Sequence, residues 1–158
     1  VWVGPVTELR LARVSDLALV ASWVCSAAHC RQWAGERVRF PVRLDQLPHE
    51  IEFENAESWW LFLRQALIGF VQVVPKPLWR VHLARLIVAP NSRGRGVGRE
   101  LTEHLLAIAY AKSPASVSLN VFPDNFFAVR LYRNLGFCPG ERPPGELPSG
   151  SQYMVHQR

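Results

Sequence analysis

The residues best suited to chemistry lie in one glycine-rich and basic stretch, Val88 to Arg99, which reads VAPNSRGRGVGR. An apolar run ends at its start, and a helical pattern of apolar residues begins at its end. Glycines let the backbone approach a ligand closely, and the first turn of a helix leaves amide N–H groups without partners. We therefore expect an anion-binding loop between a strand and a helix, with positive charge from Arg93, Arg95 and Arg99.

Two well-known phosphate-binding loops do not match this stretch. A P-loop needs a lysine followed by serine or threonine after its last glycine, whereas Gly98 is followed by Arg99 and Glu100. The dinucleotide-binding fingerprint needs G-x-G-x-x-G spacing, whereas the glycines here stand at 94, 96 and 98. The remaining pattern is Arg93-x-x-Gly96-x-Gly98. By itself it is equally compatible with an anion site and with a solvated basic turn.

A second polar and aromatic group spans Asn120 to Phe137. Asn125 and Tyr132 are about two helical turns apart, so both side chains lie on one helix face and can point along one groove. Gly136 ends this helical pattern, because glycine readily adopts the left-handed conformation found after many helices. Like the glycine-rich stretch, this group follows a predicted strand and contains the start of a predicted helix.

The elements that position both groups follow from the spacing of apolar residues. Alternation predicts strands over 7–14, 58–64, 67–74, 80–88, 116–121, 137–140 and 151–156. Helical spacing predicts a helix from Ser15 and Asp16 to about residue 33, and others over 44–54, 98–111 and 126–135. Proline and glycine in 143–150 predict a hairpin loop. Strands 80–88 and 116–121, each followed by a helix, predict a parallel pair within a mixed α/β sheet.

Length and composition restrict the class of protein. The chain has 158 residues, 49% apolar and 20% charged, which is typical of one globular domain with a single core. No apolar stretch approaches the roughly 20 residues of a membrane span, and the N-terminal residues 1–5 do not resemble a signal peptide. We therefore expect a cytoplasmic protein without a membrane partner. Three cysteines without C-x-x-C spacing fit reduced thiols, and Cys25 with His29 provides too few ligands for a metal site.

The net charge of +5 raises the question of nucleic acid. The arginines are scattered along the chain, and the only dense basic spot is the glycine-rich loop. A small ligand that carries a diphosphate explains that spot as well as DNA does, so we do not expect a nucleic-acid partner. The alternative function to keep is a non-catalytic phosphate- or nucleic-acid-binding module that uses this loop.

The two groups, taken in this order, resemble the GNAT superfamily of N-acetyltransferases. The resemblance is carried by Arg93-x-x-Gly96-x-Gly98 after one strand and, after the next, by Asn125-x-x-Ala128-x-x-Leu131-Tyr132-x-x-x-Leu135-Gly136-Phe137. It is firm over residues 80–138 and general elsewhere. It implies one domain over residues 1–158, with a mostly antiparallel twisted sheet of roughly six to seven strands, the parallel pair and about four helices. It leaves open whether the chain is a monomer or a homodimer.

The resemblance also implies acetyl-CoA as co-substrate and no metal. In relatives the glycine-rich loop binds the pyrophosphate, which here concerns Arg93, Gly94, Arg95, Gly96, Val97, Gly98 and Arg99. The strand that matches Leu86, Ile87 and Val88 pairs with the pantetheine arm, and the residue that matches Asn125 contacts the cofactor. The tyrosine that matches Tyr132 lies near the thioester sulfur as general acid. A phenol with a pKa of about 10 is protonated at pH 7 and can stabilise a leaving thiolate.

The resemblance implies an amine acceptor, which must lose a proton before it can attack. An alkyl ammonium with a pKa of about 10.4 is largely charged at pH 7, so a base is useful. His82 is the candidate, at a place where histone-acetylating relatives carry a glutamate; the alternatives are a structural histidine and a base formed by water and backbone carbonyls. The acidic segment 50–57 hints at a cationic acceptor. A peptide amine, a lysine side chain, a polyamine and an antibiotic all remain open.

Overall fold

The computed structural model describes residues 7–146 and 150–158. Residues 1–5, which the sequence analysis compares with a signal peptide, therefore lie outside the described residues. Within the predicted loop 143–150, residues 147–149 also lie outside them. The strands are β1 (Thr7–Leu11), β2 (Glu57–Leu63), β3 (Ala66–Lys76), β4 (Arg80–Val88), β5 (Ser116–Val121), β6 (Phe137–Pro139) and β7 (Gln152–His156). The helices are α1 (Leu17–Trp23), α2 (Ala27–Ala34), α3 (Leu47–Glu50), α4 (Val97–Ala111) and α5 (Phe126–Asn134).

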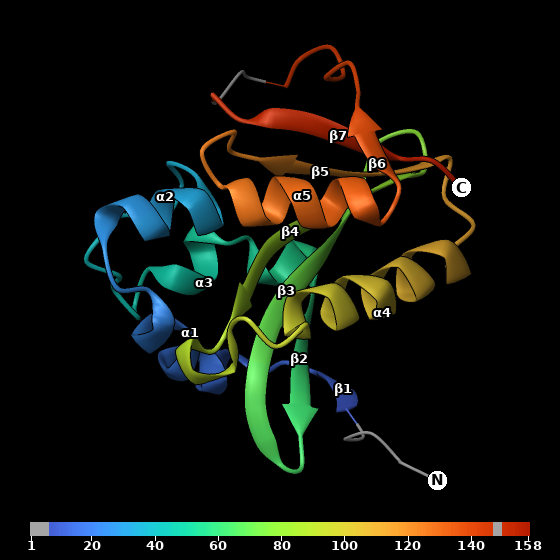
Figure 1. The fold of residues 1–158 in the computed structure, drawn as a ribbon. Coiled ribbons are helices and arrows are strands. Elements are labelled where there is room, and N and C mark those ends of the chain that lie inside the picture. The colour runs from blue at the N-terminus through green and yellow to red at the C-terminus, as the bar shows by residue number, and fades with distance from the viewer. Residues whose placement is uncertain (1–6, 147–149) are drawn as a thin grey trace, which may run out of the picture.

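One mixed sheet runs through the described residues, with strand order β1-β2-β3-β4-β5-β7-β6. The pair β4–β5 is parallel, and the other neighbouring pairs are antiparallel. In Figure 1, α4 and α5 lie on the viewer's side of the sheet. These findings confirm the predicted mixed α/β fold, including its seven strands, its parallel pair and, over the described residues, its four helices of at least seven residues.

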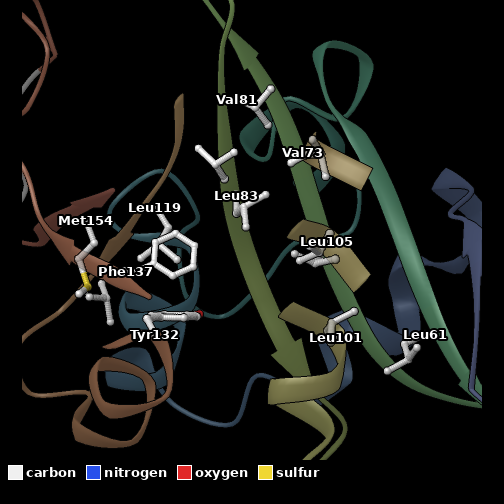
Figure 2. Packing of buried hydrophobic residues seen from close by; sticks show 14 of the residues in the cluster. Leu61, Val73, Val81, Leu83, Leu101, Leu105, Leu119, Tyr132, Phe137 and Met154 are labelled. Atoms are coloured by element: carbon white, nitrogen blue, oxygen red, sulfur yellow. The ribbon is translucent and has the colours of Figure 1, made fainter. Parts of the chain in front are cut away.

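The face under α4 and α5 holds one hydrophobic core. Leu101, Leu105 and Ala109 of α4 are fully buried, and they repeat at the helical spacing that the sequence predicts. Gly69 in β3 allows this helix to approach closely, since a Cβ at that position would lie only 3.1 Å from Cδ2 of Leu101. Figure 2 shows the leucines of α4 against β3 and β4, and Phe137 and Met154 on the other side of the same core.

The opposite face of the sheet packs on α1, α2 and α3. Trp60, Phe70 and Ile87 contribute the sheet side of this second core. Each alternates along its strand with a residue of the first core, because successive side chains of a strand point to opposite faces. The sheet thus lies between the two helical layers over most of β2, β3 and β4.

Two helix predictions were wrong in extent. The single helix predicted up to residue 33 is broken into α1 and α2, because Val24 and Ser26 are extended and the Ser26 hydroxyl accepts a 3.0 Å hydrogen bond from the backbone N–H of His29. The helix predicted over 44–54 is only α3. Pro48 lies in its first turn, where proline is tolerated, and Glu52 has a left-handed φ of 52° that prevents continuation.

Strand β4 contains a β-bulge at Arg85. Phe70 pairs with Ile87 but Gln72 pairs with Ala84, so Arg85 and Leu86 together stand opposite one residue of β3. Arg85 has a φ of 54°, which is unusual for a residue with a long side chain. The extra residue changes the alternation of β4, a change that apolar patterning alone did not predict.

The strand limits differ from prediction by more than one residue at two places. Strand β1 ends at Leu11 rather than at residue 14, and β3 continues through Pro75 to Lys76 instead of ending before the proline. None of the helices in the described part of the chain is long and apolar enough to cross a membrane.

Candidate active site

The central cavity opens where the two parallel strands separate. Strands β4 and β5 pair only from Arg80 with Ser116 to Leu83 with Leu119, although both strands continue beyond these residues. The cavity has a volume of about 710 Å³ and is lined by the end of β4, the glycine-rich loop, the first turns of α4, the end of β5 and the inner face of α5. It therefore lies between the two groups of residues that the sequence singles out.

One end of the central cavity is built to accept an anion. Gly94 and Gly96 have φ angles of +75° and +79°, which favour glycine, and α4 begins immediately after Gly96. No side chain caps this helix, and the first bond from one turn to the next runs from Glu100 N–H to the Gly96 carbonyl at 3.1 Å. The N–H groups of Val97, Gly98 and Arg99 therefore lack partners within the helix and converge on one spot.

The three arginines of the loop do not form a shared cationic surface. Arg93 lines the cavity, but its guanidinium donates to the backbone carbonyls of Val88 at 3.0 Å and Trp23 at 3.5 Å. Arg99 also lines the cavity and donates to Glu103 at 3.0 Å. Arg95 is exposed and does not contribute to the lining. Backbone amides, more than arginine side chains, thus define the anion end.

The deep end of the central cavity is largely apolar around the hydroxyl of Tyr132. Tyr132 is only 9% exposed and lines the cavity together with Leu83, Leu105 and Leu119. Burial raises the pKa of this phenol to about 12, so it is protonated at neutral pH. In Figure 2 its ring lies beneath Leu119 and its oxygen points toward β4. A protonated donor therefore ends an otherwise hydrophobic pocket.

The edge of β4 connects the two ends of the central cavity. Beyond Leu83 this strand pairs with β3 on one side only, so its other edge has no strand partner. Leu86 and Val88 line the cavity, whereas the side chain of Ile87 is buried in the opposite core. An extended ligand that carries amide groups could form hydrogen bonds along such an edge.

Asn125 stands at the cap of α5 and also lines the cavity, and its side chain makes no capping hydrogen bond. The structure thus brings most of the predicted binding residues to one cavity: Leu86, Val88, Arg93, Gly94, Gly96, Val97, Gly98, Arg99, Asn125 and Tyr132. Three of the predicted site residues do not line this cavity: Ile87, Arg95 and His82.

His82 lies on the face of the sheet opposite to Tyr132 and does not line the central cavity. Its Nδ1 is 2.8 Å from the Ser118 hydroxyl, and its Nε2 is 3.4 Å from the amide nitrogen of Asn120. Its ring stacks on Tyr153 with centroids 6.3 Å apart. The imidazole is therefore held between β4, β5 and β7, away from the protonated phenol.

Burial and positive charge keep the His82 imidazole neutral. Only 8% of the residue is exposed. Burial, and then nearby positive charges, lower the pKa of the imidazole to about 3; the charges belong to Lys76, Arg85, Arg80 and Arg142. A group with this pKa is a weak proton acceptor at neutral pH, so its surroundings favour a structural histidine over a general base.

The lining residues that were not predicted as cofactor or catalytic residues include Trp33, Asn120 and Phe127. The indole N–H of Trp33 donates to the Arg85 carbonyl at 2.8 Å, so α2 is hydrogen-bonded to the bulge of β4. Polar and apolar residues alternate along β5, which indicated that Asn120 points away from the first core. No nearby sequence feature indicated that the pairing of β5 with β4 ends at Leu119.

The described residues include no group of three or more histidine, cysteine, aspartate or glutamate side chains that could hold a metal ion. Cys25 and His29 approach each other to 3.6 Å between Sγ and Nδ1, at the exposed turn between α1 and α2.

A family model described as "Acetyltransferase (GNAT) family" matches residues 26–137. This chain belongs to the GNAT acetyltransferase family. The match includes the glycine-rich loop, β5 and all of α5, and it confirms the family inferred from the two sequence groups. Acetyl-CoA is the co-substrate of this family, as the resemblance implied, and coenzyme A is bound in solved structures with this fold.

Characterised relatives match shorter parts of this GNAT chain. N-alpha-acetyltransferase 40 of Saccharomyces cerevisiae is 38% identical over 85 residues, which are 49% of this chain and 29% of that protein. The [ribosomal protein bS18]-alanine N-acetyltransferase of Salmonella typhimurium is 35% identical over 74 residues, which are 47% of this chain and 48% of that protein. The chain thus matches less than half of either relative's length.

Solved structures match the GNAT fold over nearly the whole chain. Aminoglycoside acetyltransferase AAC(6')-Ib in complex with coenzyme A superimposes with a TM-score of 0.76 at 21% identity, covering 97% of this chain and 95% of the other. The PaiA N-acetyltransferase of Thermoplasma acidophilum with coenzyme A gives a TM-score of 0.71 at 18% identity, covering 97% and 99%. At these identities the likeness establishes the fold alone.

The low pKa of His82 predicts a pH-dependent stability. Between pH 6.5 and about 3, the His82 imidazole is protonated in the unfolded chain but stays neutral in the folded protein, where its pKa is about 3. The free energy of unfolding therefore falls as the pH falls through this range. From pH 6.5 to pH 5 this amounts to roughly 1.6 kcal/mol of unfolding free energy. We expect His82→Asn, measured by urea unfolding across this range, to have a correspondingly flatter pH dependence than the wild type.

The matched control is His49→Gln, which removes an exposed imidazole and should leave the wild-type pH dependence unchanged. An identical pH dependence of the wild type and the His82→Asn variant would show that His82 titrates normally and would restore it as a candidate base.

Proposed function

We propose that this protein transfers the acetyl group of acetyl-CoA directly to a primary amine of a small molecule or peptide. One observation carries the proposal: a single cavity joins an anion site of helix N–H groups to an apolar pocket with a protonated phenol, along the unpaired edge of β4. Acetyl-CoA has the same sequence of groups, from diphosphate through pantetheine amides to a thioester.

The residues present fit acetyl-CoA at each of these points. The N–H groups at the start of α4 would hold the pyrophosphate, since glycines at 94 and 96 keep that surface free of side chains. The β4 edge at Leu86 to Val88 would pair with the pantetheine amides, and Asn125 would contact the arm from α5. The apolar deep end would exclude water from the thioester.

Tyr132 would supply the proton that the leaving sulfur needs. When the amine forms the new C–N bond, the C–S bond breaks, and the phenol donates its proton to the thiolate. The proton lost by the amine passes to water, and water reprotonates the phenolate. The raised pKa of Tyr132 ensures that the donor form is present over the physiological pH range. No nucleophilic side chain is required in such a direct transfer.

Under this proposal His82 has no part in proton transfer. The imidazole is neutral with a pKa of about 3 and lies outside the cavity, so amine deprotonation falls to water at the acceptor side. That side is bordered by Gln32 and Trp33 of α2 and by Asn120 of β5. The role of His82 would be to hold Asn120 and Ser118 in place.

An acidic cavity of about 630 Å³ supports a cationic acceptor. It lies around α3 and the following turn, and its carboxylates belong to Asp45, Glu50, Glu52 and Glu54. It adjoins the β4 bulge, because Arg85 donates to the Ile51 carbonyl at 3.3 Å. Arg37 offsets part of the charge by pairing with Glu52, and Glu57 pairs elsewhere with Lys112. Release of free thiol from acetyl-CoA across a panel of peptides, polyamines and aminoglycosides would identify the acceptor class.

The alternative function is a non-catalytic phosphate- or nucleic-acid-binding module. The internal hydrogen bonds of Arg93 and Arg99 argue against an arginine surface for a polyanion. A thermal-shift assay separates the two functions. We expect acetyl-CoA to raise the Tm, by an amount that corresponds to about 2.7 kcal/mol at a concentration 100 times its Kd. An unchanged Tm with acetyl-CoA, together with a salt-dependent rise with an oligonucleotide, would reject the acetyltransferase.

Substitution of Tyr132 tests the proposed proton donor. Tyr132→Phe removes one hydroxyl from the deep end and preserves the packing of the ring against Phe137. We expect kcat to fall roughly 100-fold, within the usual range for loss of a general acid, while the Kd for CoA changes little. Steady-state kinetics and calorimetry measure the two quantities.

Tyr153→Phe is the matched control, since it removes a hydroxyl from a buried ring outside the central cavity and should leave kcat near the wild-type value. Unchanged turnover of Tyr132→Phe would remove the general-acid role, and equal losses in both variants would show a structural effect.

A further inference from the structure

Phe127 is an exposed aromatic residue at the edge of the central cavity. It lies in the first turn of α5, lines the cavity and is 92% exposed. The neighbouring Phe126 is 77% exposed but does not line the cavity. A phenylalanine left in water forgoes about 1.5 to 3 kcal/mol of burial, so a large exposed ring beside a ligand cavity is worth explaining.

Helix geometry places Phe127 beside the anion end of the cavity. Residues four apart lie on the same helix face, so Phe127 and Leu131 are neighbours on α5. Leu131 faces the start of α4: its Cδ2 would lie 3.5 Å from a Cβ built on Gly98. The N–H groups that form the anion end belong to this same turn of α4. Phe127 therefore projects outward from the position where a bound diphosphate would lie.

The shape of the cavity determines which part of the ligand reaches Phe127. The deep end is apolar and terminates at the buried Tyr132, so the thioester must point inward and the diphosphate outward. The group attached beyond the diphosphate then lies outside the cavity, at its rim. In CoA this group is 3′-phosphoadenosine, and a nucleobase stacks favourably on an exposed aromatic ring. Trp33 and Tyr132, the other aromatic residues of the lining, are both buried.

We propose that Phe127 is the stacking platform for the adenine of CoA. The proposal rests on the proposed function, since it assumes that the cavity binds acetyl-CoA in this orientation. It assigns the exposed ring of α5 to the nucleotide end of the co-substrate, whereas Asn125 and Tyr132 on the same helix serve its pantetheine and thioester ends.

The test compares CoA with a ligand that lacks its nucleotide. Calorimetry would measure the Kd of CoA and of 4′-phosphopantetheine, which lacks the 3′-phosphoadenosine and one phosphate of the diphosphate, for the wild type and for Phe127→Ala. Loss of one base–aromatic stack should raise the Kd of CoA about tenfold. The Kd of 4′-phosphopantetheine should not change. Phe127→Trp should retain the affinity for CoA, because indole also stacks on a base.

Phe126→Ala is the matched control, since it removes an equally large exposed ring from the same turn without touching the cavity, and it should leave both Kd values unchanged. An unchanged Kd of CoA for Phe127→Ala, or an equal rise in Kd for both ligands, would overturn the platform. Failure of the wild type to bind CoA would instead contradict the proposed function.

Discussion

The structure depends on the separation of two parallel strands. Strands β4 and β5 are held together only as far as Leu83 and Leu119, and beyond that point each backbone diverges. A strand edge without a partner leaves hydrogen-bonding groups that must find water or a ligand. The same divergence makes room for α5 to present Tyr132 and Asn125, and it directs the chain after Val88 into the loop before α4. An anion site, an amide-binding edge and a proton donor are thereby brought to one cavity.

The bulge at Arg85 adjusts this arrangement. Before it, Val81 and Leu83 point into the core beneath α4; after it, Leu86 and Val88 do so. Strict alternation from Leu83 without a bulge would instead turn Leu86 and Val88 toward the opposite layer. The guanidinium of Arg85 turns to that opposite layer and donates to Gln72 at 2.7 Å, where burial lowers the pKa of the guanidinium to about 10. The bulge thus helps to form the cavity on one face and a fixed positive charge on the other.

Sequence reasoning recovered the features that depend on local patterns. The glycines before Val97, the helical spacing of Leu101 and Leu105, and the strand–helix order around β5 are all encoded within short windows. The surroundings of His82 were not recoverable, because its neighbours Ser118 and Tyr153 lie far along the chain. The break at Ser26 and the exposed position of Phe127 are similar cases, since a capping hydroxyl and an unburied ring resemble ordinary helix residues in sequence.

The central claim is that acetyl-CoA lies along the edge of β4 with its diphosphate on the first turn of α4. Hydrogen–deuterium exchange with and without acetyl-CoA tests this claim most directly, because it reads the backbone N–H groups themselves. Acetyl-CoA bound in this way should slow exchange of the amides of 84–88 and 94–99 and leave those of 44–56, around the acidic cavity, unchanged. Binding of acetyl-CoA with unchanged exchange over 84–99, or with protection centred on 44–56, would contradict it.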